Sequence, residues 1–186
     1  MAELYNMVNV PTGAWIDETG TIVRANEVAF STDTFRSITG VESGSYLAAL
    51  RDWANKGASS KYVLPPDEVR RRMALPSREH LQANAFFRLG EYLCELGRSS
   101  DAVPFFKQAR QLRPESWNYT RQAFALGDPE RDYQTTFVRE VQKLNGKLYY
   151  PILDLDGTGR NPEQEAVAAR AADEVRKATE AAARRN

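Results

Sequence analysis

The sequence has little of the residues from which catalytic and metal sites are usually built. Among its 186 residues there is one cysteine, Cys94, and one histidine, His80. A single cysteine cannot form an intrachain disulfide, and a lone histidine without partners at motif spacing forms neither a catalytic triad nor a zinc site. No phosphate-binding loop or dinucleotide fingerprint is present. We therefore expect a protein that is not an enzyme, with no catalytic residue, no metal and no cofactor.

The sequence also lacks an excess of either charge. Lysine and arginine total 25, aspartate and glutamate total 25, and the net charge is zero. Nucleic-acid-binding domains usually carry a basic excess, so this balance argues against a nucleic-acid partner. The densest basic run, EVRRRM at 68–73, has acidic neighbours and is typical of a solvated helix face.

Long apolar runs are absent as well. No segment approaches the roughly 20 apolar residues that a membrane-spanning helix needs. The N-terminus lacks the basic segment and apolar core of a signal peptide. Together with the single cysteine, these features predict a cytoplasmic protein with no membrane span.

Hydrophobic patterning predicts a mostly α-helical chain with a β-hairpin at its N-terminus. Two short apolar segments, 13–17 and 21–24, flank a glycine-containing turn, which is a hairpin signal. Helical spacing follows at 45–56, at 118–126 and at 130–144. The expected segments are a hairpin (1–26), a helical connector (27–76), a group of helices (77–126), a helix and apolar strap (127–161) and a long Ala-rich C-terminal helix (162–186).

The strongest motif is one tetratricopeptide repeat (TPR) unit of 32 positions, from Ala83 to Pro114. In such a unit, large residues fill the grooves between two antiparallel helices and small residues let the helices approach. Gly97 falls at the turn, and Leu93 stands where tyrosine is usual. We expect Gly90 to lie opposite one of the two alanines of the second helix. The expected packing residues are Phe86, Leu89, Gly90, Ala102, Phe106, Ala109 and Pro114.

A lone repeat leaves part of its surface uncovered, because about three repeats are usually needed for stability. The cover must come from segment 46–53, from segment 117–124 or from a partner. Two interpretations stay open. The repeat is a protein-binding surface, or it caps its own domain.

With the hairpin and the repeat together, the chain resembles the C-terminal part of ResA-like thioredoxin-fold proteins that carry a tetratricopeptide-type extension. The resemblance covers most of residues 2–126. It implies that the hairpin is a thioredoxin-like remnant and that Pro11, in Val10-Pro11-Thr12, is the cis-proline that borders the redox dithiol. It rests on AELYNMVNVPTGAWIDETGTIVRANE, YLAALRDWANKG, the Leu64-Pro65-Pro66 break, FRLGEYLCELG and RPESWNYTRQAFAL.

The sequence departs from this family where the redox chemistry occurs. Disulfide exchange needs paired cysteines, usually as Cys-x-x-Cys at a helix N-terminus, and that helix would lie upstream of Met1. Cys94 instead falls within the repeat, close to Leu93 and Leu96, and is expected to be a small buried hydrophobe. The dithiol half of the fold is therefore expected to be absent.

Without neighbouring strands, a hairpin exposes both its edges and its apolar side chains. A two-stranded sheet is marginally stable by itself, and its edges favour pairing with another chain. We therefore expect the hairpin to be an assembly element. Its expected interaction residues are Val8, Val10, Trp15, Ile16, Ile22 and Val23.

The C-terminal region carries two patterns with two interpretations each. Residues 154–165, DLDGTGRNPEQE, have carboxylates at calcium-loop spacing, but the lack of a preceding helix favours a simple turn. Small residues at spacings of three and four form a heptad seam, which indicates either one solvated helix or a coiled-coil contact. The seam residues are Ala168, Ala171, Val175, Ala178 and Ala182.

These features favour a non-catalytic interaction or scaffold subunit. Such a chain would assemble into a homo-oligomer or join a larger complex through a protein partner. The alternative is a shortened product of a thioredoxin-like redox enzyme, of the thiol-disulfide or peroxide type, whose dithiol would be encoded upstream.

Overall fold

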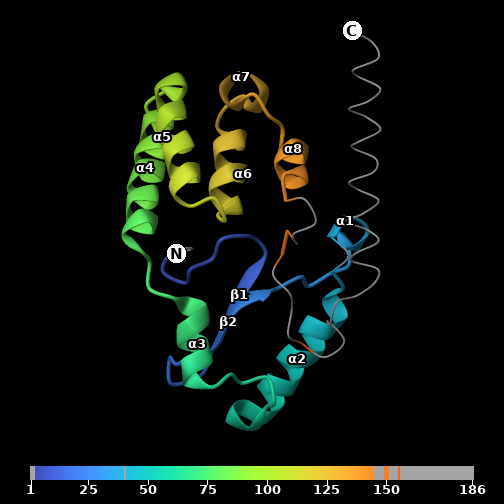
Figure 1. The fold of residues 1–186 in the computed structure, drawn as a ribbon. Helices are drawn as coiled ribbons and strands as arrows, with labels where there is room; N and C mark the ends of the chain where they lie inside the picture. Colours follow the sequence, from blue (N-terminus) through green and yellow to red (C-terminus); the bar gives the residue numbers. More distant parts are fainter. Residues whose placement is uncertain (1–2, 40, 145–148, 151–154, 156–186) are drawn as a thin grey trace.

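The structure is a computed structural model that describes residues 3–39, 41–144, 149, 150 and 155. Within these residues the chain is mostly helical, with a two-stranded antiparallel sheet near its N-terminus (Figure 1). The expected fold class is thereby confirmed. The Ala-rich helix and its seam lie outside the described residues, and so does the calcium-like loop apart from Leu155.

The hairpin consists of β1 (Thr12–Ile16) and β2 (Ile22–Val28). The turn between them is organised by the Asp17 carboxylate, whose Oδ1 accepts from the backbone N–H groups of Thr19 and Thr21 at 2.9 Å each. Gly20 has a φ of 83°, a backbone conformation that favours glycine. The sequence therefore encodes the turn locally.

β2 continues four residues beyond its predicted end, and its pairing with β1 is irregular. Gly13 faces Glu27, whereas Trp15 faces Arg24, so β2 contains an extra residue between these pairs. Asn26, with a φ of 58°, lies in this bulge. Arg24 and Glu27, three positions apart, can therefore contact each other, which regular alternation along a strand would prevent.

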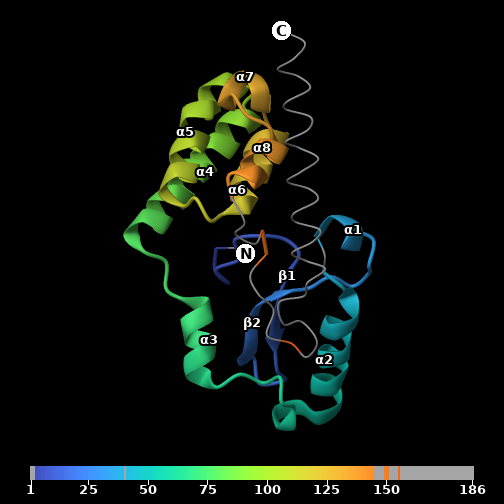
Figure 2. The ribbon, with the colours of Figure 1, turned by 45° about the vertical axis from the view of Figure 1, so that its right-hand side comes forward.

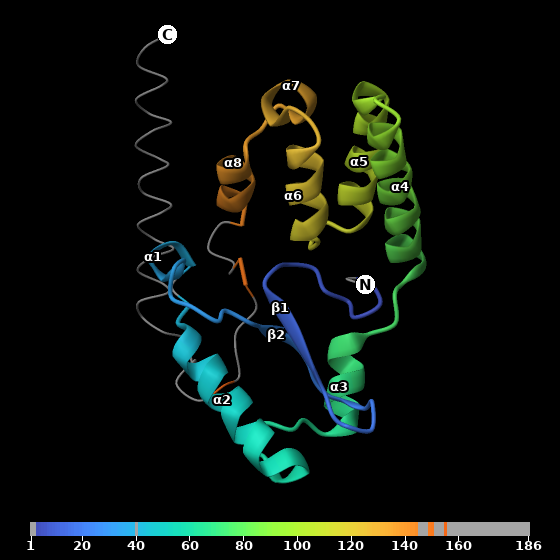
Figure 3. The same cartoon turned by 180° about the vertical axis from the view of Figure 1, so that it is seen from behind.

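Helices lie on both sides of the hairpin, as Figures 1 and 3 show. On one side, α1 (Arg36–Thr39), α2 (Ser43–Lys56) and the 3₁₀ turn η1 (Gly57–Ser59) follow in sequence. Trp15 stacks on Trp53 of α2 with ring centroids 5.1 Å apart. On the other side, α3 (Pro66–Met73) contacts β2.

The remaining helices form a group above the hairpin (Figure 2). They are α4 (Arg78–Glu95), α5 (Ser99–Leu112), α6 (Trp117–Ala125), α7 (Pro129–Tyr133) and α8 (Phe137–Gln142). Ser77 and Ser116 cap α4 and α6 by accepting from the backbone N–H groups of His80 and Tyr119. Gly97, with a φ of 73°, lies in the turn that makes α4 and α5 an antiparallel pair.

The prediction of a single helix over 130–144 is wrong. Gln134 has a left-handed φ of 55° and ends α7. Thr136 then caps α8, because its Oγ1 accepts from the backbone N–H of Arg139 at 3.3 Å. The apolar periodicity of this segment continues across the break and therefore could not reveal it.

The largest group of buried apolar residues lies between α4, α5 and α6. Smaller groups connect the hairpin to α2 and to Tyr150 and Leu155. Among the helices that the structure describes, none is long and apolar enough to cross a bilayer.

Candidate functional site

The α4–α5 pair packs closely because a glycine faces a phenylalanine. A Cβ atom placed on Gly90 would lie 2.6 Å from Cε1 of Phe106, far inside normal contact distance. Gly90 therefore faces Phe106, and the prediction that it faces Ala102 or Ala109 is wrong. Both alanines are fully buried one turn to either side of Phe106, and their small size lets the ring reach Gly90.

One side of this pair is covered by α6. Phe87 of α4 stacks on Tyr119 of α6, with ring centroids 4.3 Å apart and an interplanar angle of 17°. Burial raises the pKa of the Tyr119 phenol, so this ring stays neutral at physiological pH. Segment 117–124 thus supplies cover for the repeat, whereas segment 46–53 packs against the hairpin.

The opposite side of α4 carries a line of exposed apolar residues. Leu89 follows Phe87 by two positions, so the two side chains point about 160° apart around the helix. Leu89, expected to be a packing residue, is instead 40% exposed. Its neighbours at helical spacing are exposed too, and we call the whole set the α4 stripe: Leu81 (59%), Ala85, Leu89 (40%), Tyr92 (55%) and Leu96 (53%).

No described element covers the α4 stripe, and α4 lies at the edge of the molecule in Figures 1 and 3. Beside it, Phe86 of α4 and Phe105 of α5 are half-buried and stack with centroids 6.4 Å apart. Pro114 follows the end of α5, as predicted, but its side chain is exposed rather than packed. The apolar surface therefore continues from α4 onto α5.

Charged residues border the α4 stripe. Arg88 and Glu91 form an ion pair on α4, with Nη1 and Oε2 3.0 Å apart. Arg78 lies exposed at the start of α4 and Glu95 lies exposed at its end. In line with the stripe, α4 thus carries Arg78 at its start and Glu95 at its end, whereas Glu79, the next residue after Arg78, points about 100° away around the helix.

The hairpin offers less interaction surface than its sequence predicts. Trp15 is only 3% exposed, because α2 and Tyr62 cover it, so its assignment as an interaction residue is wrong. Val8, Ile22 and Val23 are half-buried. Of the six expected residues, Val10 and Ile16 remain exposed, at 49% and 41%.

The loop before β1 is held against the helix group through its backbone. The Val10–Pro11 peptide bond is cis, the configuration that the resemblance implied for Pro11. The Val10 carbonyl accepts from Tyr150 Oη at 3.0 Å and from Arg121 Nη1 at 3.2 Å. This loop is therefore a contact between the hairpin and α6.

Aromatic rings pack beside this loop. The Arg121 guanidinium lies over the rings of Tyr149 and Phe137, 5.3 and 5.8 Å from their centroids. Trp117 contacts Tyr149 with centroids 4.6 Å apart, and burial raises the pKa of the Tyr149 phenol to about 12. These rings pack the loop before β1 against α6 and α8.

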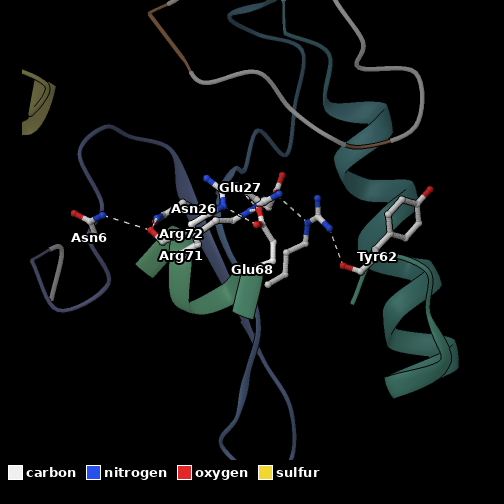
Figure 4. A network of polar contacts seen from close by, with 8 residues as sticks. Asn6, Asn26, Glu27, Tyr62, Glu68, Arg71 and Arg72 are labelled. Atoms are coloured by element: carbon white, nitrogen blue, oxygen red, sulfur yellow. Dashed lines mark hydrogen bonds and ion pairs between the residues drawn. The ribbon is translucent and has the colours of Figure 1, made fainter. Parts of the chain in front are cut away.

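A buried polar network joins β2 to α3 (Figure 4). Arg24 and Glu27 are each 2% exposed and form an ion pair with Nε and Oε1 2.8 Å apart. Arg24 also donates to the Tyr62 carbonyl at 2.7 Å, and Arg72 donates to Glu27 at 2.8 Å. Arg72 continues the network to Glu68 at 2.7 Å. The sequence does not indicate this pair, because an arginine and a glutamate three positions apart are typical of contact on a helix and not on a strand.

Acid should weaken this network through Glu68. Hydrogen bonds from Arg71 and Arg72 hold the pKa of Glu68 at about 2, below the ordinary value of about 4.3. A carboxylate with a lowered pKa stabilises the folded state above its unfolded pKa, and this stabilisation is lost as the pH falls through the folded pKa. We expect the free energy of unfolding of Glu68→Gln, measured with urea, to fall less steeply than that of the parent from pH 5 to about 2.

The matched control for this prediction is Glu18→Gln, which removes an exposed carboxylate from the hairpin turn, away from the network and from the α4 stripe. Its pH dependence should follow that of the parent chain. If Glu68→Gln and the parent lose stability with the same slope, the Arg71 and Arg72 contacts do not lower the Glu68 pKa in solution.

Cys94 and His80, the other residues considered as candidates from the sequence, both lie in α4. Cys94 is half-buried in α4 and packs against the group of buried residues between α4, α5 and α6. His80 Nε2 lies 3.2 Å from Glu115 Oε1, which connects the start of α4 to the loop before α6. Within the described ranges, no group of histidine, cysteine, aspartate and glutamate side chains could hold a metal ion.

Comparison with known proteins gives no relative: no family model matches the sequence, and neither a curated protein nor a solved structure matches it. The thioredoxin-like and tetratricopeptide resemblances therefore stay predictions.

Proposed function

We propose that the chain is a non-catalytic interaction subunit that assembles with copies of itself or with another protein. The α4 stripe is the observation that carries this proposal. Contiguous exposed apolar patches on soluble proteins mark interaction sites, whereas single exposed apolar residues do not. Burying each large side chain is worth roughly 1.5–3 kcal/mol, so covering the stripe would favour association.

The position of the stripe supports the same proposal. Stacked helical repeats need polar outer faces at their ends to stay soluble. Here the outer face of α4, an 18-residue helix with a packed core behind it, is apolar. Such a face is suited to receive another helix without rearrangement.

A protein partner fits the charges better than a nucleic acid does. The arginines of α3 are each paired with a carboxylate: Arg70 with Asp67, Arg71 with Glu68, and Arg72 with Glu68 and Glu27. Together with the zero net charge, these pairs leave little basic surface for phosphates. The single cysteine supports a cytoplasmic location as part of this proposal.

The proposal is tested by measuring the size of the assembly that contains the chain in extract from its own cells. Extract from cells that express the tagged full chain would be separated by size-exclusion chromatography, with and without mild cross-linking. We expect the chain to elute at an apparent mass well above the 21.0 kDa of the monomer. Elution as a free monomer in both samples would contradict the proposed function.

The alternative, a thioredoxin-like redox activity, has its own test. We expect insulin reduction in the presence of dithiothreitol to proceed at the rate of the thiol blank, because a dithiol mechanism needs two cysteines and the chain has one. Replacing Cys94→Ser should leave this rate unchanged. A rate well above the blank that disappears in Cys94→Ser would favour the redox alternative.

A further inference from the structure

We propose that the partner of the α4 stripe is the α4 stripe of a second copy, packed antiparallel about a two-fold axis near Leu89. This inference rests on the proposed function and names its partner. A two-fold interface requires a surface that is complementary to itself. The side-chain sizes and charges along the stripe meet this requirement.

The sizes of the facing side chains match when α4 packs antiparallel against α4 of a second copy. With Leu89 beside Arg88 of the second copy, Leu81 lies opposite Leu96, and Ala85 lies opposite Tyr92. A small residue therefore faces the largest one, twice by symmetry. This alternation is the arrangement in which ridges of one helix enter grooves of another.

The charges match in the same register. Reversal brings Arg78, at the start of one α4, toward Glu95, at the end of the other. Arg78 of one copy would then lie about one helical turn, about 6 Å along the axis, from Glu95 of the other, within reach of these long side chains. Arg88 lies near the two-fold axis, but Glu91 of the same helix neutralises it at 3.0 Å.

The arrangement also explains how the repeat is covered on both sides. In each copy α6 covers one side of α4, through Phe87 and Tyr119, and the second copy would cover the other. The stripe occupies one face of one helix, so the contact belongs to the smaller class of protein interfaces. We expect a reversible dimer in the micromolar range rather than a permanent one.

The first test is sedimentation of the purified full chain over a concentration series. We expect a monomer–dimer equilibrium that Tyr92→Glu weakens at least about tenfold, since each dimer carries the substitution twice in an apolar contact. The matched control is Gln111→Glu, which adds the same charge at an exposed position of α5. A parent chain that stays monomeric at all concentrations would overturn the inference.

The second test addresses the register. Arg78→Glu alone should weaken the dimer, and the double variant Arg78→Glu with Glu95→Arg should restore it. In a Cys94→Ser background, Leu89→Cys should cross-link two copies on oxidation, whereas Gln111→Cys should not. Failure of the charge exchange to restore association, or equal cross-linking at both positions, overturns the antiparallel arrangement. Circular dichroism of each variant checks that it is folded.

These results separate the inference from the proposed function. If the chain elutes as an assembly from its own cells while the purified chain is monomeric, the inference fails and the proposed function stands. The same holds if a dimer forms and Tyr92→Glu leaves it intact, because association then uses another surface. A monomer in the cell extract contradicts the proposed function itself.

Discussion

Replacing Glu27→Ala should lower the free energy of unfolding by about 3–5 kcal/mol, because it breaks a buried ion pair with Arg24 and removes the contact of Arg72 with the same carboxylate. Both side chains of this pair are 2% exposed, and Arg24 is held in place by the Tyr62 carbonyl and by the Trp15 ring, whose centroid lies 5.6 Å away. The guanidinium therefore cannot easily turn to water. Equilibrium unfolding in urea, followed by tryptophan fluorescence, measures the loss.

Two variants make this result specific. Glu18→Ala removes an exposed glutamate from the hairpin turn and should change stability by less than about 0.5 kcal/mol. Arg24→Met combined with Glu27→Leu removes both charges and should recover part of the loss, because apolar residues of similar volume often replace a buried ion pair without cost and Arg72 keeps its contact with Glu68. If Glu27→Ala unfolds at the same urea concentration as Glu18→Ala, the pair is not buried in solution.

Phe106→Ala should lower the free energy of unfolding by about 3–5 kcal/mol, through lost burial and the cavity left between α4 and α5. Phe106 is 2% exposed and contacts Phe87 with ring centroids 5.2 Å apart. Gly90→Ala should cost about 1–3 kcal/mol by itself, because the added methyl group overlaps the Phe106 ring. Thermal and urea unfolding of both variants measure these changes.

The double variant tests whether the two changes act at one contact. With Phe106→Ala in place, Gly90→Ala no longer meets the ring, so its cost should disappear and the two changes should not add. Gly44→Ala is the matched control, because a Cβ there has open space and the helix position in α2 favours alanine. Additive losses would place Gly90 away from Phe106.

The helices were predictable where local signals agree with packing. Helical spacing, Gly97 at the turn and serines before α4 and α6 together mark the α4–α5–α6 group. The break at Gln134 was not predictable, because glutamine has no strong preference for the left-handed backbone that it adopts there. The partner of Gly90 depends on how far the helices rotate about their axes, which spacing alone does not determine.

The candidate site was only partly predictable, for a different reason. Leu89 fits a repeat motif, and the motif assigns it to packing, although a motif cannot tell whether the neighbouring helix is present. A signal did exist: α4 has apolar residues on two opposite faces, with Phe87 on one and Leu89 and Tyr92 on the other. A helix with two apolar faces needs two partners.

The bulge at Asn26 determines how β2 would respond to the loss of one residue. Insertions and deletions are usually tolerated in loops and harmful inside regular elements. At this point β2 already holds one residue more than regular pairing needs, so deletion of Asn26 would leave Arg24 and Glu27 two positions apart, which regular alternation places on one face. Such a deletion would keep the two charges together, and what it would remove is the hydrogen bond that Asn26 donates to the Arg72 carbonyl.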